Sequence, residues 1–349
     1  MKKVILLSGL IIMLFAGCRK ENDEPVEISY GDGVFIINQG NFTVGNSSLS
    51  YFEPGTSKKY NHLFSAVNDV PLGDVAQSMV LDDKFAYVVV NNSGVIHVIN
   101  RWDAKQVGKI TGLVSPRHLL KISADKAYVS DFFSTSMTVI NPSTYEVTGE
   151  IPVGRSTEEM IPFQDVVFVA NWSGYNQTLL NNKLLVIDAS QDKVVDSVQV
   201  GIEPNSMVLD KFDNLWVLCS GGFENAEIPT LWKIDPSDYQ VLDTLFFPEL
   251  EAYPESLETN GSHDSLFFLN DGIFRMSVND TLIPEEAFIE EDTDRIFMAL
   301  GVDPVTGDLY VSNPLNYQSN GKVYRFSSSG GFRNEFEAGI VPGAFVFNY

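Results

Sequence analysis

Short runs of apolar residues, each ended by a polar turn-forming residue, recur along the chain at spacings of 41 to 50 residues. The clearest form is an apolar pair followed by Asn or Asp, as in residues 98–100, 139–141 and 186–188. The central residues of the seven copies are Phe52, Ile99, Ile140, Ile187, Ile234, Met276 and Phe326. A period in this range with several short strands per repeat is typical of a β-propeller. The pattern predicts an all-β fold, a seven-bladed propeller with four antiparallel strands per blade.

Each repeat contains further strands around the one just described. An aromatic-Val-x-Asn strand precedes it, and the copies are residues 35–38, 87–91, 128–131, 168–171, 216–220, 267–270 and 310–313. β-Branched and aromatic runs bounded by Asn, Gly, Ser and Pro are strand signals. Candidate first strands are residues 77–81, 117–120, 159–163, 205–209, 255–257, 296–300 and 342–347. Candidate outer strands, at 147–151, 194–200 and 241–246, alternate apolar and polar residues, whereas no stretch of a dozen residues carries a helical period.

The order of these strands predicts how the ring closes. The first repeat begins at its second strand, residues 34–38, and the last first-strand pattern, residues 342–347, has no further strand after it. A blade cannot bury its hydrophobic faces alone, and an open ring would leave unsatisfied edges. We therefore expect the C-terminal strand to pair into the first blade, so that one propeller covers residues 30–349.

The start of the chain predicts export and a lipid anchor. Residues 1–17 combine Lys2 and Lys3 with a short apolar run and small residues, which is a signal-peptide pattern, and the run is too short to span a bilayer. Small residues ending at Cys18 resemble a bacterial lipobox, which implies cleavage before Cys18 and lipidation of its thiol. Residues 18–29 form a charged tether that resembles the surface-export signals of Bacteroidetes lipoproteins; a plain solvated linker is the alternative.

Composition narrows the choice of ligand. The chain carries 23 Lys and Arg against 46 Asp and Glu, a formal net charge of −23, with no basic stripe for phosphates, so we expect no nucleic-acid partner. Cys219 is the only cysteine besides Cys18, and in a strand it is expected to act as a small hydrophobic residue.

One face of the predicted ring differs from the other in chemistry. The loops between second and third strands are long and rich in amides and aromatics, whereas the turns between first and second strands are short and charged. Loops on a rigid scaffold are common binding sites, and amides suit a neutral ligand with many polar groups. The aromatic candidates are Phe42, Phe132, Phe133, Trp172, Tyr175, Phe223 and Tyr317. Turn formation and packing beneath the loops are the structural alternative.

Polar residues at or just after the ends of the second strands form a second candidate group. They are Asn38, Gln39, Asn91, Asp131, Asn171, Asn270 and Asn313. Several should lie near the central tunnel, where oxygen ligands could hold Ca²⁺ with Glu159, Glu203 or Glu255 supplying a carboxylate. Asn at strand ends more often caps turns, and hard cations favour more charge, so we expect no resident metal or cofactor.

Other catalytic signals are weak. The four histidines lack ligand spacing, and the chain contains no nucleophile elbow, phosphate loop or Cys-x-x-Cys pair. Arg117 and Arg155 precede or begin first strands on the loop-rich face. Each could hold a ligand phosphate or pair with a nearby acid.

The aromatic-Val-x-Asn strand followed by Val-Ile-Asn-Pro, as in residues 128–142, resembles the YncE-like, surface-layer-type seven-bladed propellers. With the lipobox-like Cys18 and the acidic tether, the chain resembles Bacteroidetes surface lipoproteins of the BtuG type. That resemblance implies capture of cobalamin at the outer membrane, on the exterior, and its delivery to a TonB-dependent transporter, without enzymatic activity. The flat aromatics and amides of the loops are compatible with a corrin ring, and Arg117 or Arg155 with its nucleotide phosphate.

Two other functions remain open from the sequence. One is a metal-dependent, lactonase-like hydrolase, which chelator-sensitive lactone cleavage would support. The other is an adhesion or assembly scaffold that uses the same face for a protein.

Overall fold

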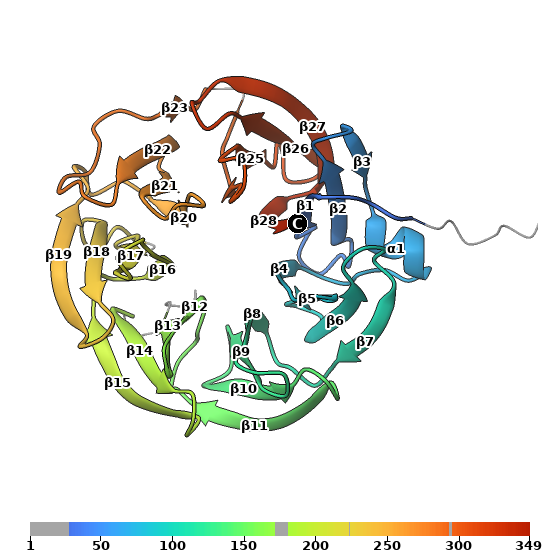
Figure 1. Cartoon of the computed structure of the whole chain (residues 1–349), viewed down its shortest axis with the longest axis horizontal. Helices are drawn as coiled ribbons and strands as arrows, with labels where there is room; N and C mark the ends of the chain where they lie inside the picture. Colours follow the sequence, from blue (N-terminus) through green and yellow to red (C-terminus); the bar gives the residue numbers. More distant parts are fainter. Residues whose placement is uncertain (1–27, 172–180, 223, 293–294) are drawn as a thin grey trace, which may run out of the picture.

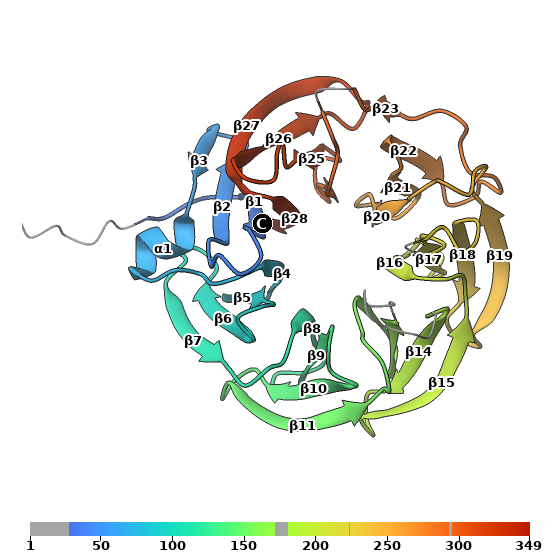
Figure 2. The same ribbon diagram turned by 180° about the vertical axis from the view of Figure 1, so that it is seen from behind.

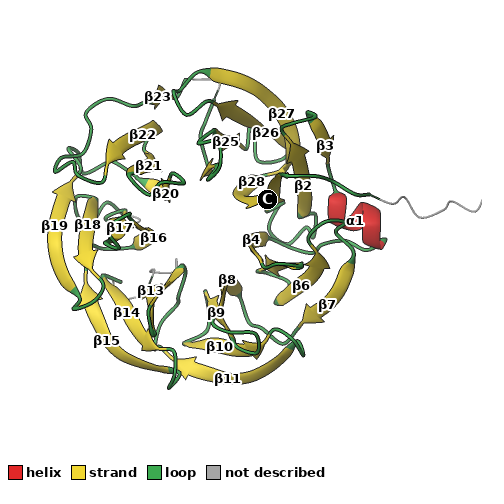
Figure 3. Cartoon of the chain, viewed as in Figure 1, coloured by secondary structure: helices red, strands yellow, loops and turns green. Residues whose placement is uncertain are grey.

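The strands of the computed structural model form seven four-stranded antiparallel sheets arranged as blades around a centre (Figures 1 and 3). The structure describes residues 28–171, 181–222, 224–292 and 295–349. From the centre outward, the first four blades contain β28 (Pro342–Asn348), β1 (Gly33–Asn38), β2 (Ser48–Glu53) and β3 (Lys58–Tyr60); β4 (Ala76–Leu81), β5 (Phe85–Val90), β6 (Val95–Asn100) and β7 (Gln106–Ile110); β8 (Pro116–Lys121), β9 (Ala127–Asp131), β10 (Ser136–Asn141) and β11 (Glu146–Pro152); and β12 (Met160–Phe163), β13 (Val166–Ala170), β14 (Lys183–Asp188) and β15 (Lys193–Gln199).

The last three blades follow the same order. They contain β16 (Pro204–Leu209), β17 (Leu215–Cys219), β18 (Thr230–Asp235) and β19 (Gln240–Phe246); β20 (Glu255–Thr259), β21 (Ser265–Leu269), β22 (Gly272–Ser277) and β23 (Ile289–Glu290); and β24 (Leu300–Val302), β25 (Leu309–Asn313), β26 (Asn320–Phe326) and β27 (Phe332–Ile340). We number these seven sheets blades 1 to 7. The predicted fold class is confirmed.

The hydrophobic core lies between the blades. In the described part of the chain, seven clusters of buried residues each join one blade to the next. The second strands are buried on both faces, and for that reason they read as continuous β-branched and aromatic runs. Outer strands such as β11 and β15 face solvent and carry the alternating pattern. Cys219 is fully buried in β17, as its strand context predicts.

The ring closes at blade 1 (Figure 2). β28 pairs antiparallel with β1, from Gly33 opposite Asn348 to Asn38 opposite Pro342, which confirms the predicted closure. Arg101 of blade 2 holds the end of β28. Its Nε donates to Asn348 Oδ1 at 2.6 Å and its Nη2 donates to the carbonyl of Tyr349 at 2.9 Å.

Three details differ from the sequence pattern. The first strand of blade 7, β24, starts at Leu300, later than predicted. The amide of Met298 donates to the Ser312 carbonyl and that of Ala299 to the Ser312 hydroxyl, so these two residues leave the regular ladder. The outer strand of blade 6, β23, has only two residues. A six-residue helix, α1 (Leu63–Asn68), connects blades 1 and 2 and buries Leu63 and Phe64. Within the described residues, no helix combines the length and apolarity needed to cross a membrane.

Candidate functional site

The loops from second to third strands and from fourth to first strands meet at one face, which we call the loop face. Three of the aromatics predicted to bind ligand are exposed there: Phe42 by 67%, Phe133 by 66% and Tyr317 by 46%. The amide of Asn41 donates to the carbonyl of Tyr317 at 2.5 Å, so the loops of blades 1 and 7 are joined. Val44 and Leu315 belong to the same two loops and are also exposed. We call Phe42, Val44, Leu315 and Tyr317 the apolar sector.

The polar residues at the strand ends form hydrogen bonds within the scaffold. Asn38 donates to Ser50 Oγ at 2.9 Å and accepts from the Gly339 amide at 2.9 Å. Asn91 donates to Ser115 Oγ at 2.9 Å, which joins blade 2 to blade 3. Both side chains are at least nine-tenths buried, so they position the loops.

Three further members of this group play the same part. Asp131 accepts from the amides of Ser115, Phe133 and Ser134 at 2.7 to 2.9 Å. Asn270 accepts from the Tyr253 amide at 3.1 Å, and Asn313 accepts from the Leu315 amide at 2.8 Å. Each of the three fixes the backbone of a loop.

The other two residues of this group also follow second strands but differ in their surroundings. Gln39 is half-buried against the start of β28. Its side-chain amide lies so close to Gly343 that a Cβ at that position would come within 2.3 Å of it. Asn171 is buried at the end of β13, and its Oδ1 lacks a hydrogen-bond partner among the described residues. Trp172, Tyr175, Phe223 and Cys18 lie outside the described residues, so their predicted roles stay predictions.

Arg117 is held by its neighbours. Its Nε lies 2.8 and 2.9 Å from the two carboxylate oxygens of Glu158, and its Nη1 donates to Gln77 Oε1 at 2.7 Å. The guanidinium also lies over the Phe132 ring, 5.3 Å from its centre. Arg155 donates to Asn181 Oδ1 at 2.7 Å. The charge of Arg117 is therefore already compensated inside the protein, which leaves it less suited to a ligand phosphate.

The first strands enclose a pocket of about 240 Å³, which we call the inner pocket. Its lining residues come from blades 2 to 6: Gln77, His118, Glu158, Glu159, Asn205, Ser206, Ser220, Tyr253, Glu255 and Ser256. Glu159 and Glu255 were expected near the tunnel from the sequence, whereas the other lining residues were not singled out.

A repeated signal marks these residues in the sequence. In blades 2 to 6, two polar residues stand directly before a Met or Leu, at the start of the first strand or just before it. We call these five pairs the polar arc: Gln77 and Ser78, Arg117 and His118, Glu158 and Glu159, Asn205 and Ser206, and Glu255 and Ser256. The corresponding positions of blades 7 and 1 carry no such pair. On the loop face, the polar arc spans five blades and the apolar sector spans the other two, and Phe133 of blade 3 is a further exposed aromatic.

The carboxyl groups of the inner pocket differ in charge state. Burial opposes ionisation of Glu158, but Arg117 and His118 outweigh burial and hold the pKa of Glu158 below its usual value. Burial raises the pKa of Glu159, although its Oε2 accepts from the Met207 amide at 2.9 Å. Burial also raises the pKa of Glu255 to about 7.

Glu258 lies beside Glu159, and burial together with that neighbouring charge raises the pKa of Glu258 to about 8. Near neutral pH, Glu255 and Glu258 can therefore donate hydrogen bonds as well as accept them. Such a set of groups suits a neutral polar ligand. In the described part of the chain, no three His, Cys, Asp or Glu side chains are grouped to hold a metal ion.

Comparison with solved structures supports the fold. A quinoprotein alcohol dehydrogenase-like protein from Bacteroides thetaiotaomicron matches 91% of this chain and 78% of its own, with a TM-score of 0.70 and 13% identity. The periplasmic gluconolactonase of Pseudomonas aeruginosa matches 91% and 99%, with a TM-score of 0.65 and 12% identity. Apo AztD from Citrobacter koseri matches 91% and 98%, with a TM-score of 0.59 and 12% identity. At these identities the likeness extends to the fold alone.

Sequence comparison identifies the family. No curated protein matches the chain. A profile described as a domain of unknown function, DUF5074, matches residues 32–338, which includes part or all of every blade. The chain belongs to the DUF5074 family of β-propeller proteins.

Proposed function

We propose that this protein is a non-enzymatic capture protein that binds a large, neutral, amphipathic ligand on its loop face. The observation that carries the proposal is the division of that face into the polar arc and the apolar sector. A ligand with an apolar surface and a fringe of amides or hydroxyls would contact both parts at once. The partly protonated Glu255 and Glu258 lower the charge that such a ligand would meet.

A corrinoid such as cobalamin is the ligand class that we favour. Its broad macrocycle would lie on Phe42 and Tyr317, and the amides around its edge would reach the polar arc. Since Arg117 is compensated by Glu158, the nucleotide phosphate of a corrinoid would remain toward solvent. The resemblance of the sequence to BtuG-type lipoproteins supports this ligand.

The cellular part of the proposal rests on the sequence. Lipidation of Cys18 would anchor the propeller at the outer membrane, facing the exterior, and the captured ligand would pass to a TonB-dependent transporter. Cys18→Ala is expected to abolish incorporation of radiolabelled palmitate and to release the protein from membranes. Normal labelling of that variant would contradict the anchor.

Calorimetric titration with cyanocobalamin tests the ligand directly. Residues 19–349 are expected to bind it one-to-one, and the double variant Phe42→Ala/Tyr317→Ala to bind at least about tenfold more weakly, because aromatic anchors dominate such sites. The matched control is Phe246→Ala, an equally exposed aromatic on the outer strand β19. Absence of binding, or equal affinity in all three proteins, would reject the corrinoid site.

The same preparation separates capture from the competing functions. Lactone hydrolysis that disappears with a chelator would identify a metal-dependent hydrolase. Binding to a cell-surface protein without any small-molecule requirement would instead identify a scaffold.

A further inference from the structure

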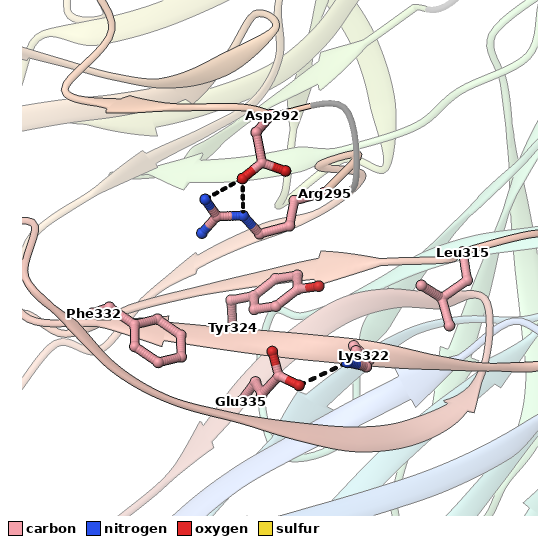
Figure 4. A pocket seen from close by; sticks show the side chains of 7 residues that line it. All are labelled: Asp292, Arg295, Leu315, Lys322, Tyr324, Phe332 and Glu335. Carbon is pink, nitrogen blue, oxygen red and sulfur yellow. Dashed lines mark hydrogen bonds and ion pairs between the residues drawn. The ribbon is translucent and has the colours of Figure 1, made fainter.

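A second cavity, of about 410 Å³, lies at the outer part of the junction between blades 6 and 7 (Figure 4). Its origin is the short outer strand of blade 6. β23 pairs with β22 only at Gly272 and Ile273, whereas β27 of blade 7 runs for nine residues. The blade 6 face of β26 and β27 is therefore left partly uncovered toward the perimeter. This outer cleft shares no residue with the inner pocket.

The cleft has an aromatic floor. Tyr324 of β26 packs into the cluster between blades 6 and 7, and its ring forms the middle of the cleft (Figure 4). Phe332 lies at one end and is 56% exposed, and Leu315 lies at the other end and is 38% exposed. Exposed aromatic and aliphatic side chains beside a cavity indicate a surface that a ligand can cover.

The rims of the cleft carry two ion pairs. On one side, Arg295 Nε donates to Asp292 Oδ2 at 2.6 Å. On the other side, Lys322 Nζ donates to Glu335 Oε1 at 2.6 Å. Two cations and two carboxylates give the cleft no net charge, and each pair offers both donors and acceptors. The four side chains are between 33% and 45% exposed, so a ligand can reach them.

We propose that the outer cleft binds a neutral pyranose sugar. A pyranose has an apolar ring face that can stack on the exposed ring of Phe332. Tyr324 is 4% exposed and lies beneath the guanidinium of Arg295, so it supports the cleft from below. Its hydroxyl groups each donate and accept, so they match rims that present Arg295 and Lys322 as donors and Asp292 and Glu335 as acceptors. A charged ligand would have to break one of the ion pairs, whereas a neutral polyol adds hydrogen bonds to both. The cleft volume lies within the range of small-ligand sites, roughly 300–1,000 Å³.

Ligand-observed NMR with the methyl pyranosides of glucose, galactose, mannose and N-acetylglucosamine tests this site. The full folded chain is expected to transfer saturation to the ring protons of at least one of them, and sorbitol, an open-chain polyol without a flat apolar face, is expected to receive far less. Phe332→Ala should raise the Kd about threefold to tenfold, which corresponds to the loss of one aromatic contact. Phe246→Ala is the matched control and should leave the Kd unchanged.

Glu335→Gln provides a second, surface-exposed variant that removes a charged acceptor from the rim, and it should also weaken binding. Absence of transfer to all four sugars, equal transfer to sorbitol, or equal affinity after Phe332→Ala would each overturn the proposal. Because Phe42 and Tyr317 lie outside the cleft, Phe42→Ala/Tyr317→Ala should leave sugar binding intact. The capture proposal and the sugar proposal can therefore fail separately.

Discussion

At the scale of single residues, Arg117 shows how a binding candidate can instead stabilise the fold. Its guanidinium bridges three blades, through Gln77 of blade 2 and Glu158 at the start of blade 4. Glu158 is buried, and its side chain is only 8% exposed. A carboxylate this well buried needs its partner, so the arginine is expected to matter more for stability than for a ligand.

Arg117→Met should therefore destabilise the propeller by about 3–5 kcal/mol, because it leaves the charge of Glu158 buried with only His118 beside it. Urea unfolding followed by circular dichroism measures this loss. The double variant Arg117→Met/Glu158→Leu removes both charges and should recover most of the stability. Full stability of the single variant would show that the ion pair is dispensable.

Glu258 should make stability depend on pH. Its pKa of about 8 in the folded protein lies above the ordinary carboxyl value of 4.5, so folding favours its protonated form. The contribution of protonated Glu258 to folding stability is complete below the ordinary carboxyl pKa and is lost as pH rises through about 8. Glu258→Gln stays neutral, and should therefore gain thermal stability over the native protein at about pH 9 but not at about pH 4.

Thermal unfolding across that range checks the prediction for Glu258, with the exposed Glu251→Gln as the control. Parallel pH profiles for the native protein and Glu258→Gln would contradict it.

At the scale of the elements, the sequence pattern located nearly every inner strand because these strands are buried on both faces. β9 and β25 are fully buried along their length, and such strands need unbroken apolar runs. β23 could not be found from its sequence, since two residues carry no period. α1 was missed because its six residues make fewer than two helical turns, which is too short to show an apolar period.

The closing strand β28 yields a prediction at this scale. Arg101→Ala removes the hydrogen bonds to Asn348 and Tyr349 and leaves the side-chain amide oxygen of Asn348 buried without this donor. A loss of roughly 1–3 kcal/mol is expected from chemical denaturation, the cost of an unsatisfied buried group. Lys105→Ala is the control, because Lys105 is exposed and its pair with Asp103 spans 3.8 Å. Similar losses in both variants would show that Arg101 does not hold the ring closed.

At the scale of the whole molecule, the candidate site combines polar residues from blades 2 to 6 with apolar residues from blades 7 and 1. Asn38 and Asp131, at the ends of second strands, were expected near the tunnel, and their side chains bond to neighbouring strands and loops. Most residues that line the inner pocket come instead from the polar pairs at or just before the start of the first strands. The repetition of these polar pairs was visible in the sequence. The direction in which their side chains point depends on how the blades twist around the centre. Of the aromatic candidates for ligand binding, Phe42, Phe133 and Tyr317 are exposed on their loops, so a ligand can reach them.

The net charge of −23 allows a test of the ligand class. If the captured ligand is neutral, the Kd for cyanocobalamin should change by less than about twofold between low salt and roughly 0.5 M salt, because screening acts only on charged partners. Calorimetry at the two salt concentrations measures it. A steep loss of affinity with salt would contradict a site that recognises its ligand without net charge.

The pairing of β28 with β1 also bears on when the molecule can fold. Blade 1 takes three strands from the beginning of the propeller and its innermost strand from the end. A chain that emerges amino end first therefore presents β1 with a free inner edge until the final strand has appeared. The cluster between blades 7 and 1, which stacks Phe52 on Phe336, forms equally late. Completion of the ring is thus delayed until the last strand has been synthesised, and the first blade is expected to stay incompletely packed until then.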